Sequence, residues 1–258
     1  MRNRRRYADC VSLDGRRALR KALAESEGAA LHSDIQALAR SRRLFEKNCE
    51  ELLTLLNSTR DTNTALQLFS VENRAGFDRF LDEVDRLLHN ALAAAVSLRD
   101  HSYRVRDKWM KPEGGDQLRQ QHDERVKAVF AESTTAQLVE GLRNIYQHRK
   151  LPRLLGHTLV IPGEVFKSSI VFDTDDLLKW DGWRPEIRAL LIAREDPISL
   201  DELVTEYRAA VDAFHEWFGS AVRQRNTALL GELQKQLHEV VEYERSLFGP
   251  AIDDPSRE

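Results

Sequence analysis

The feature that most constrains this fold is a long stretch, from Val71 to Trp109, in which apolar residues keep a helical spacing. Along it, apolar side chains recur three and four positions apart, as on one face of an α-helix; they are Phe77, Phe80, Leu81, Val84, Leu87, Leu88, Ala91 and Ala95. A helix of this length covers such a stripe only by packing against other long helices. The sequence therefore predicts a bundle of long helices.

Helical spacing also occurs elsewhere in the chain. It predicts further helices over residues 16–56, with a break near Gly28, and over 116–130, 175–179, 185–194 and 199–247. Thr134 precedes Gln137 by three positions, and Ser199 precedes Glu202 by three. This is the spacing of a capping box, which marks a helix N-terminus. We therefore expect one helix to begin at Thr134 and end before Pro152, and another to begin at Ser199.

Two β-rich segments interrupt the helical pattern. Residues 158–161 and 168–172 flank Pro162 and Gly163, and this arrangement predicts a β-hairpin inserted at about 154–174. Because an isolated hairpin is marginally stable, it should pack on the bundle. The predicted fold is thus an all-α, long-helix bundle with a small β-hairpin insertion. Residues 16–258 are expected to form one helical domain, after a basic, disordered tail over 1–15.

Composition and charge exclude several classes of protein. The 258 residues, 41% of them hydrophobic, suffice for a sizeable core, and the net charge of -3 argues against a general nucleic-acid coat protein. The longest weakly apolar run, Ala91–Leu98, is too short to span a bilayer, and no signal-peptide pattern follows Met1. Cys10 and Cys49 lack the spacing of a disulfide framework or a metal site. We expect a cytoplasmic protein without a membrane partner.

Arg143-Asn144-Ile145-Tyr146-Gln147-His148 is the segment that suggests a reaction. At about 100° per residue, Asn144 lies roughly 100° and His148 roughly 140° from Arg143 around the helix. The hydrophobic side chains fall on the opposite arc; they are Leu138, Val139, Leu142, Ile145 and Tyr146. A guanidinium, an amide and an imidazole therefore share one polar face.

These three groups suit phosphodiester cleavage of RNA. A neutral histidine titrates near working pH, so His148 is expected to take the proton from a ribose 2′-hydroxyl as general base. Arg143 is expected to hold the phosphate as negative charge builds, and Asn144 to orient the imidazole or the phosphate. This chemistry requires no metal or other cofactor. The basic residues that follow, Arg149, Lys150 and Arg153, are candidates for RNA binding.

The motif resembles that of the HEPN domains, helical bundles whose ribonuclease members carry an Arg, a polar residue and a His, with four to six residues between Arg and His. Arg143, Asn144 and His148 match that pattern with four intervening residues. The resemblance implies a metal-independent endoribonuclease in which two subunits bring their motifs together, and it suggests a toxin or defence effector with an antitoxin or other regulatory partner. Lys150 stands where many HEPN toxins have a tyrosine, so regulation through that tyrosine is not expected here.

A non-catalytic alternative fits the same sequence. The bundle is also suited to a helical adaptor or sensing module that binds a protein partner or a small ligand. Other candidate groups are weaker. The second Arg–His match, Arg208 to His215, has Ala209 after the arginine. A helix also offers three possible metal ligands, His238, Glu239 and Glu242, but nothing that would complete a metal site. Trp180 and Trp183 flank a turn, where packing is the more common role.

Overall fold

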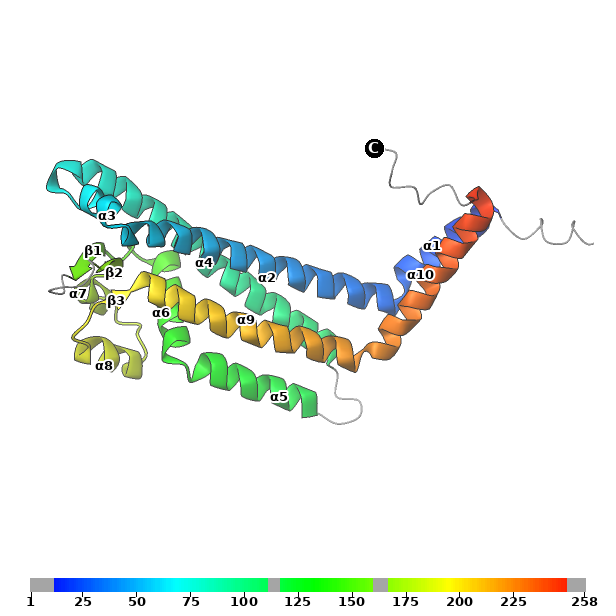
Figure 1. The fold of residues 1–258 in the computed structure, drawn as a ribbon. Helices are drawn as coiled ribbons and strands as arrows, with labels where there is room; N and C mark the ends of the chain where they lie inside the picture. The colour runs from blue at the N-terminus through cyan, green and yellow to red at the C-terminus, as the bar shows by residue number, and fades with distance from the viewer. Residues whose placement is uncertain (1–11, 111–116, 160–166, 250–258) are drawn as a thin grey trace, which may run out of the picture.

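The computed structural model describes residues 12–110, 117–159 and 167–249. It is an all-α bundle with a small antiparallel sheet at one end and a two-helix arm at the other (Figure 1). This confirms the predicted fold class. Among the described helices, none has the length and apolarity required to cross a bilayer.

The long helices α2 (Glu27–Asn57) and α4 (Arg74–Trp109) run antiparallel along the bundle (Figure 1). Helices α9 (Leu200–Arg225), α5 (Gln117–Val126) and α6 (Thr134–His148) pack beneath them. The long helix predicted from Val71 starts slightly later, because Val71–Asn73 forms a 3-10 turn capped by the hydroxyl of Ser70. Its predicted stripe contributes core residues such as Val84 and Leu88.

The start of α6 differs from the prediction by one residue. Ser133, not Thr134, is the N-cap, and its hydroxyl accepts a hydrogen bond from the Ala136 N–H at 3.2 Å. Gln137 reaches past the cap and donates to the Ala131 carbonyl, so no capping box forms. The preceding segment, Lys127–Ala131, is a π-helical turn that continues α5.

The second predicted capping box is also wrong. Ser199 is the N-cap of α9, but its side chain makes no capping hydrogen bond. Its hydroxyl bonds to the carboxylate of Asp201 instead. A serine hydroxyl bonded to a neighbouring carboxylate is not available to the helix N-terminus, which explains the difference.

The first predicted helical region divides at Ser26. Helix α1 (Leu13–Glu25) ends there, and the Ser26 hydroxyl caps α2 by accepting from the Ala29 N–H. Gly28 lies just after the break, where α10 (Thr227–Phe248) crosses α2. A side chain does not fit at this crossing, because a Cβ at Gly28 would lie 2.8 Å from the Leu229 carbonyl oxygen. Helix α1 begins at Leu13, inside the predicted tail 1–15; residues 1–11 of that tail lie outside the described residues.

Helices α1 and α10 form the arm, side by side and angled away from the bundle (Figure 1). The Glu244 carboxylate on α10 accepts hydrogen bonds from Arg20 Nε at 2.6 Å and Arg16 Nε at 2.7 Å on α1. These two bonds lower the pKa of Glu244 to about 2.

We predict that this arm loosens in acid. Because the pKa of Glu244 is depressed in the folded state, its stabilising effect is present above the usual value near 4.5 and is lost as pH falls toward about 2. The protection of amides in α1 and α10 against hydrogen exchange should therefore fall over this pH range more than the protection of amides in α4. The Glu244→Gln variant should be less protected in α1 and α10 at neutral pH and should lose less further protection in acid. Equal pH profiles for wild type and variant would contradict the prediction.

The sheet joins two distant parts of the chain. Strands β1 (Leu154–Leu159) and β2 (Lys167–Phe172) form the predicted antiparallel hairpin, with Leu154 opposite Phe172. The first strand begins four residues earlier than expected, and the predicted turn at Pro162 lies outside the described residues. Strand β3 (Ile198–Ser199), which was not predicted, pairs antiparallel with β2. It anchors the hairpin beside the start of α9.

Short helices complete the structure. They are α3 (Thr62–Leu68), a 3-10 turn at Ser58–Arg60, α7 (Thr174–Leu178) and α8 (Pro185–Ala193). The carboxylate of Asp173 caps α7 by accepting from two backbone N–H groups. Trp183, just before α8, is buried and packs directly over Gly141 of α6.

Candidate functional site

Helix α6 presents the two arcs that its sequence predicts. Its apolar arc is buried; the buried members include Leu138, Val139, Leu142, Ile145 and Tyr146. On the polar arc, Arg143 and Asn144 are half-buried, and Gln147 and His148 are exposed. Packing against α4 and α9 therefore determines which side of α6 remains accessible.

Tyr146 belongs to the packed arc, as expected. Its hydroxyl donates a hydrogen bond to Asp85 Oδ1 on α4 at 2.5 Å. Burial raises the pKa of the phenol, so it stays protonated and donates. Burial also raises the pKa of Asp85. This hydrogen bond links α6 to α4. Because the Tyr146 hydroxyl is buried in this contact, it cannot take part in proton transfer at the polar face.

Arg143 and Asn144 form a unit on the polar arc. Arg143 Nη1 donates to Asn144 Oδ1 at 2.9 Å. Among the described residues, no carboxylate lies within ion-pair distance of this guanidinium, and its Nε is buried without a hydrogen-bond partner. Most buried polar atoms in proteins have a partner, so an unpaired one on a cation indicates a place for an anion.

His148 occupies the last turn of the same helix and is exposed. The helix ends there because Arg149 has an extended backbone, and the Arg149 N–H donates the last helical hydrogen bond to the Ile145 carbonyl at 2.8 Å. Arg143 lines a cavity, described below, whose lining does not include His148. Within one chain, the structure therefore places the expected phosphate clamp and the expected base in different surroundings.

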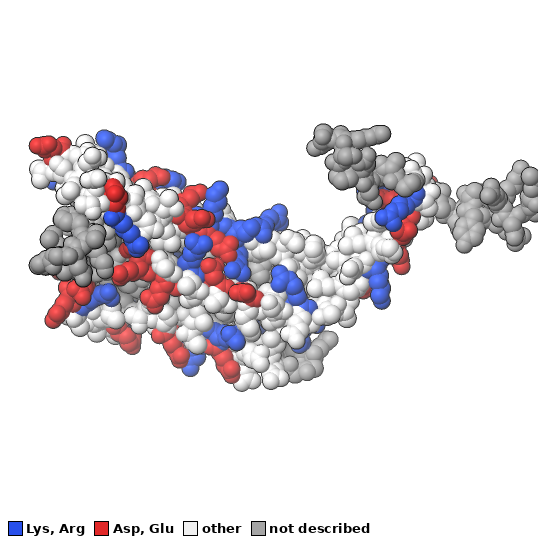
Figure 2. All heavy atoms as spheres, in the orientation of Figure 1, with Lys and Arg blue, Asp and Glu red and all other residues white. Residues whose placement is uncertain are grey.

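The candidate RNA-binding residues follow α6. Arg149 is exposed, and Arg153 forms an ion pair with Asp173, so the charge of Arg153 is already balanced. Lys150 lines a groove with four acidic residues: Asp78, Asp82, Asp85 and Asp176. On the face shown in Figure 2, acidic and basic side chains are interspersed, without one continuous basic surface. Any RNA contact here would be local.

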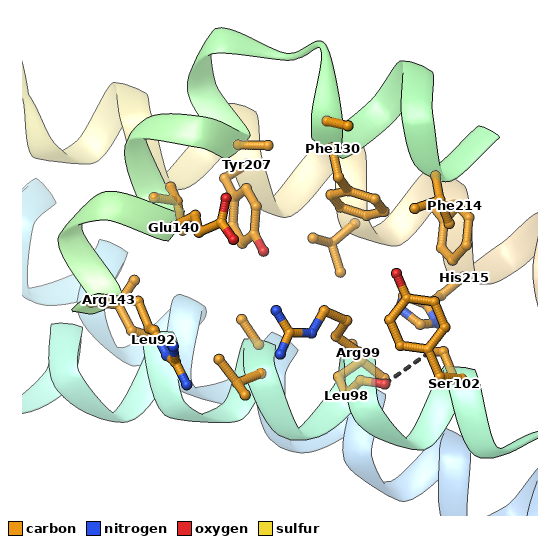
Figure 3. Close-up of a pocket in the computed structure, with 18 of the residues that line it drawn as sticks. Leu92, Leu98, Arg99, Ser102, Phe130, Glu140, Arg143, Tyr207, Phe214 and His215 are labelled. Carbon is orange, nitrogen blue, oxygen red and sulfur yellow. Dashed lines mark hydrogen bonds between the residues drawn. The ribbon is translucent and has the colours of Figure 1, made fainter. Parts of the chain in front are cut away.

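A cavity of about 230 Å³ lies between α4, α6 and α9, closed at one side by the π-helical turn (Figure 3). Its α4 wall includes the apolar residues Leu92, Ala95, Val96 and Leu98, and also Arg99, Ser102 and Tyr103. Aromatic side chains from the other elements extend the lining; they are Phe130, Tyr207 and Phe214. Arg143 lies at one end of the cavity and His215 at the other.

Apart from Arg143, the polar groups of this cavity were not predicted as site residues. His215 is only 7% exposed, and among the described residues neither ring nitrogen has a hydrogen-bond partner. Burial, and then the nearby charge of Arg42, lower the pKa of His215 to about 4, so the imidazole is neutral at pH 7. Burial raises the pKa of Tyr207 to about 12. The only sequence signal for His215 was its weak match to the arginine–histidine spacing.

The remaining candidates have structural roles. Trp180 and Trp183 pack edge to face with ring centroids 4.8 Å apart, and the Trp183 Nε1–H donates to the Leu177 carbonyl. No group of three His, Cys, Asp or Glu side chains suited to a metal ion occurs within the described ranges. Cys49 is buried with a free thiol, whereas Cys10 is outside the described residues.

The chain was compared with protein-family models, curated proteins and solved structures. None of them matches it. The assignment of function therefore depends on the chemistry of the residues described above.

Proposed function

We propose that this protein is a metal-independent endoribonuclease that uses Arg143, Asn144 and His148. The observation that carries the proposal is the Arg143 guanidinium, which Asn144 holds in place and which no described carboxylate neutralises. A cation held in this way, without an internal counter-ion, is suited to the growing negative charge of a phosphodiester transition state. The exposed His148 on the same helix supplies an imidazole that can accept and return a proton.

The reaction follows from these groups. His148 takes the proton of a ribose 2′-hydroxyl, the 2′-oxygen attacks the adjacent phosphorus, and the bond to the 5′-oxygen breaks. The leaving oxygen receives a proton from the imidazolium, which regenerates neutral His148. The products are a 2′,3′-cyclic phosphate and a 5′-hydroxyl. Arg143 stabilises the charge on the non-bridging oxygens during this transfer.

A second subunit would complete the site. Because Arg143 lines a cavity that His148 of its own chain does not line, we propose a homodimer in which the polar arcs of two α6 helices face each other. Each phosphate would then be held by Arg143 of one subunit and approached by His148 of the other. The HEPN resemblance, a cytoplasmic location, and a toxin or defence role with a regulatory partner stay predictions.

The decisive experiment is cleavage of RNA in EDTA. We expect the purified protein to cleave RNA without added metal, and to leave a matched oligonucleotide with 2′-deoxyribose throughout intact, because the nucleophile belongs to the substrate. The 5′ fragment should end in a cyclic phosphate by mass spectrometry. Activity that EDTA abolishes, or equal cleavage of the deoxy substrate, would refute this mechanism. Absence of cleavage across structured and unstructured RNAs would refute the enzyme itself.

A non-catalytic adaptor is the second candidate, and the arm favours it. Helix α1 has no buried residue, and the arm exposes four large apolar side chains: Leu13, Leu237, Val241 and Phe248. Apolar groups exposed on a projecting helix pair are suited to packing against partner helices. For an adaptor, RNA would stay intact in the assay above, and a Val241→Glu substitution would abolish partner binding while the thermal stability of the bundle stays unchanged.

A further inference from the structure

Three polar groups in the cavity between α4, α6 and α9 lack partners. Arg143 Nε is buried without a hydrogen bond, and so is His215 Nδ1. No described group bonds to the Tyr207 hydroxyl either. Leaving the two buried atoms, Arg143 Nε and His215 Nδ1, without partners costs about 1–3 kcal/mol each. Their concentration around one cavity indicates a site whose ligand supplies the missing hydrogen bonds.

The charged residues around the cavity indicate the net charge of the ligand. Arg184 at the rim pairs with Glu140 at 2.9 Å, and Arg99 pairs with Asp100 at 3.2 Å. Among the described lining residues, Arg143 is thus the cation without a carboxylate partner. One available positive charge, with the Glu140 carboxylate in the same lining, suits a small ligand that carries a single negative charge.

The lining and the volume of the cavity indicate the size and polarity of the rest of the ligand. Between Arg143 and His215 the lining is mostly apolar and aromatic, with Leu92 and Leu98 on one side and Phe130 on the other (Figure 3). The Arg99 guanidinium, which is paired with Asp100, also faces this space. An apolar cavity of about 150 Å³ is known to accept benzene, so about 230 Å³ accommodates one ring with short substituents. At the end of the cavity opposite Arg143, the neutral imidazole of His215 can form a hydrogen bond with an uncharged polar group of the ligand.

We propose that this cavity binds a small aromatic carboxylic acid that carries a hydroxyl at the end opposite the acid. The carboxylate pairs with Arg143, the ring lies against the α4 wall, and the hydroxyl bonds to His215 or Tyr207. The inference does not rest on the nuclease, because occupancy of the cavity is measured without RNA.

The test uses the full-length protein and calorimetric titration with 4-hydroxyphenylacetate as the probe. We expect saturable binding at one site, with an affinity at least tenfold higher than that of the uncharged alcohol 4-hydroxyphenylethanol. Phenylacetate, which lacks the hydroxyl, should bind more weakly than the probe. Binding of the alcohol as tightly as the acid would overturn the assignment of Arg143 as the carboxylate partner.

Two variants locate the site. Arg143→Met removes the cation and should weaken binding of the probe by about ten- to a hundredfold, since hydrogen bonds to charged groups contribute about 1.5–3 kcal/mol. Ala95→Phe fills the cavity from α4 and should abolish binding, which keeps the test valid if the arginine variant does not fold. The control Arg149→Gln removes an exposed charge beyond the cavity and should bind normally. No saturable binding by wild type, or undiminished binding by both cavity variants, would overturn the proposal.

Discussion

Replacing His148 with alanine is expected to reduce RNA cleavage by about 10²–10⁴-fold, the usual contribution of a positioned general base. The imidazole is exposed at the end of α6, so its removal leaves no cavity and should not alter folding. The loss should therefore appear in kcat, with the thermal midpoint unchanged. The measurement is the initial rate of RNA cleavage in EDTA at saturating substrate.

Two comparisons make the result specific. His89→Ala removes another exposed histidine, on α4, and should cleave RNA at the wild-type rate. Mixing His148→Ala with Arg143→Ala tests the dimeric site: if Arg143 and His148 act from different subunits, half of the dimers are mixed and each has one intact site, so about a quarter of the activity returns. No recovery would show that the two residues act within one chain. Wild-type activity in His148→Ala would end the catalytic assignment.

Gly141→Ala is expected to destabilise the protein by about 2–4 kcal/mol, although alanine is normally the better residue in a helix. A Cβ at Gly141 would lie 2.0 Å from Trp183 Cζ3, so the indole must leave its place. Trp183 is buried and its Nε1–H donates to Leu177, so displacement loses both packing and a hydrogen bond. Overpacking costs about 1–3 kcal/mol, and loss of a buried tryptophan about 3–5; helix propensity returns about 1.

The matched control is Gly231→Ala, in the second turn of α10. No heavy atom lies within 4 Å of a Cβ built there, so only helix propensity acts. This variant should gain about 0.5–1 kcal/mol. Guanidinium titration measures both free energies of unfolding, and tryptophan fluorescence should shift to longer wavelength in Gly141→Ala alone. A stabilised Gly141→Ala variant would show that Trp183 does not pack on Gly141 in solution.

Local patterns predicted some parts of this molecule well and others poorly. The buried arc of α6 follows directly from helical periodicity, because the period of the backbone fixes which side chains share a face. The helix caps were less predictable: Ser133 replaces Thr134 at the start of α6, since neighbouring hydroxyls compete for the same N–H groups. Strand β3 is two residues long and has no pattern to detect.

By itself, the sequence determined that long amphipathic helices would form a bundle with a hairpin inserted, and that Arg143, Asn144 and His148 would share the polar side of one helix. Only the tertiary structure decided that Arg143 lines a cavity with His215, a residue far away in the chain and on another helix. Periodicity describes how one helix is divided into faces. Which faces meet, and what space remains between them, depends on the packing of all the helices at once.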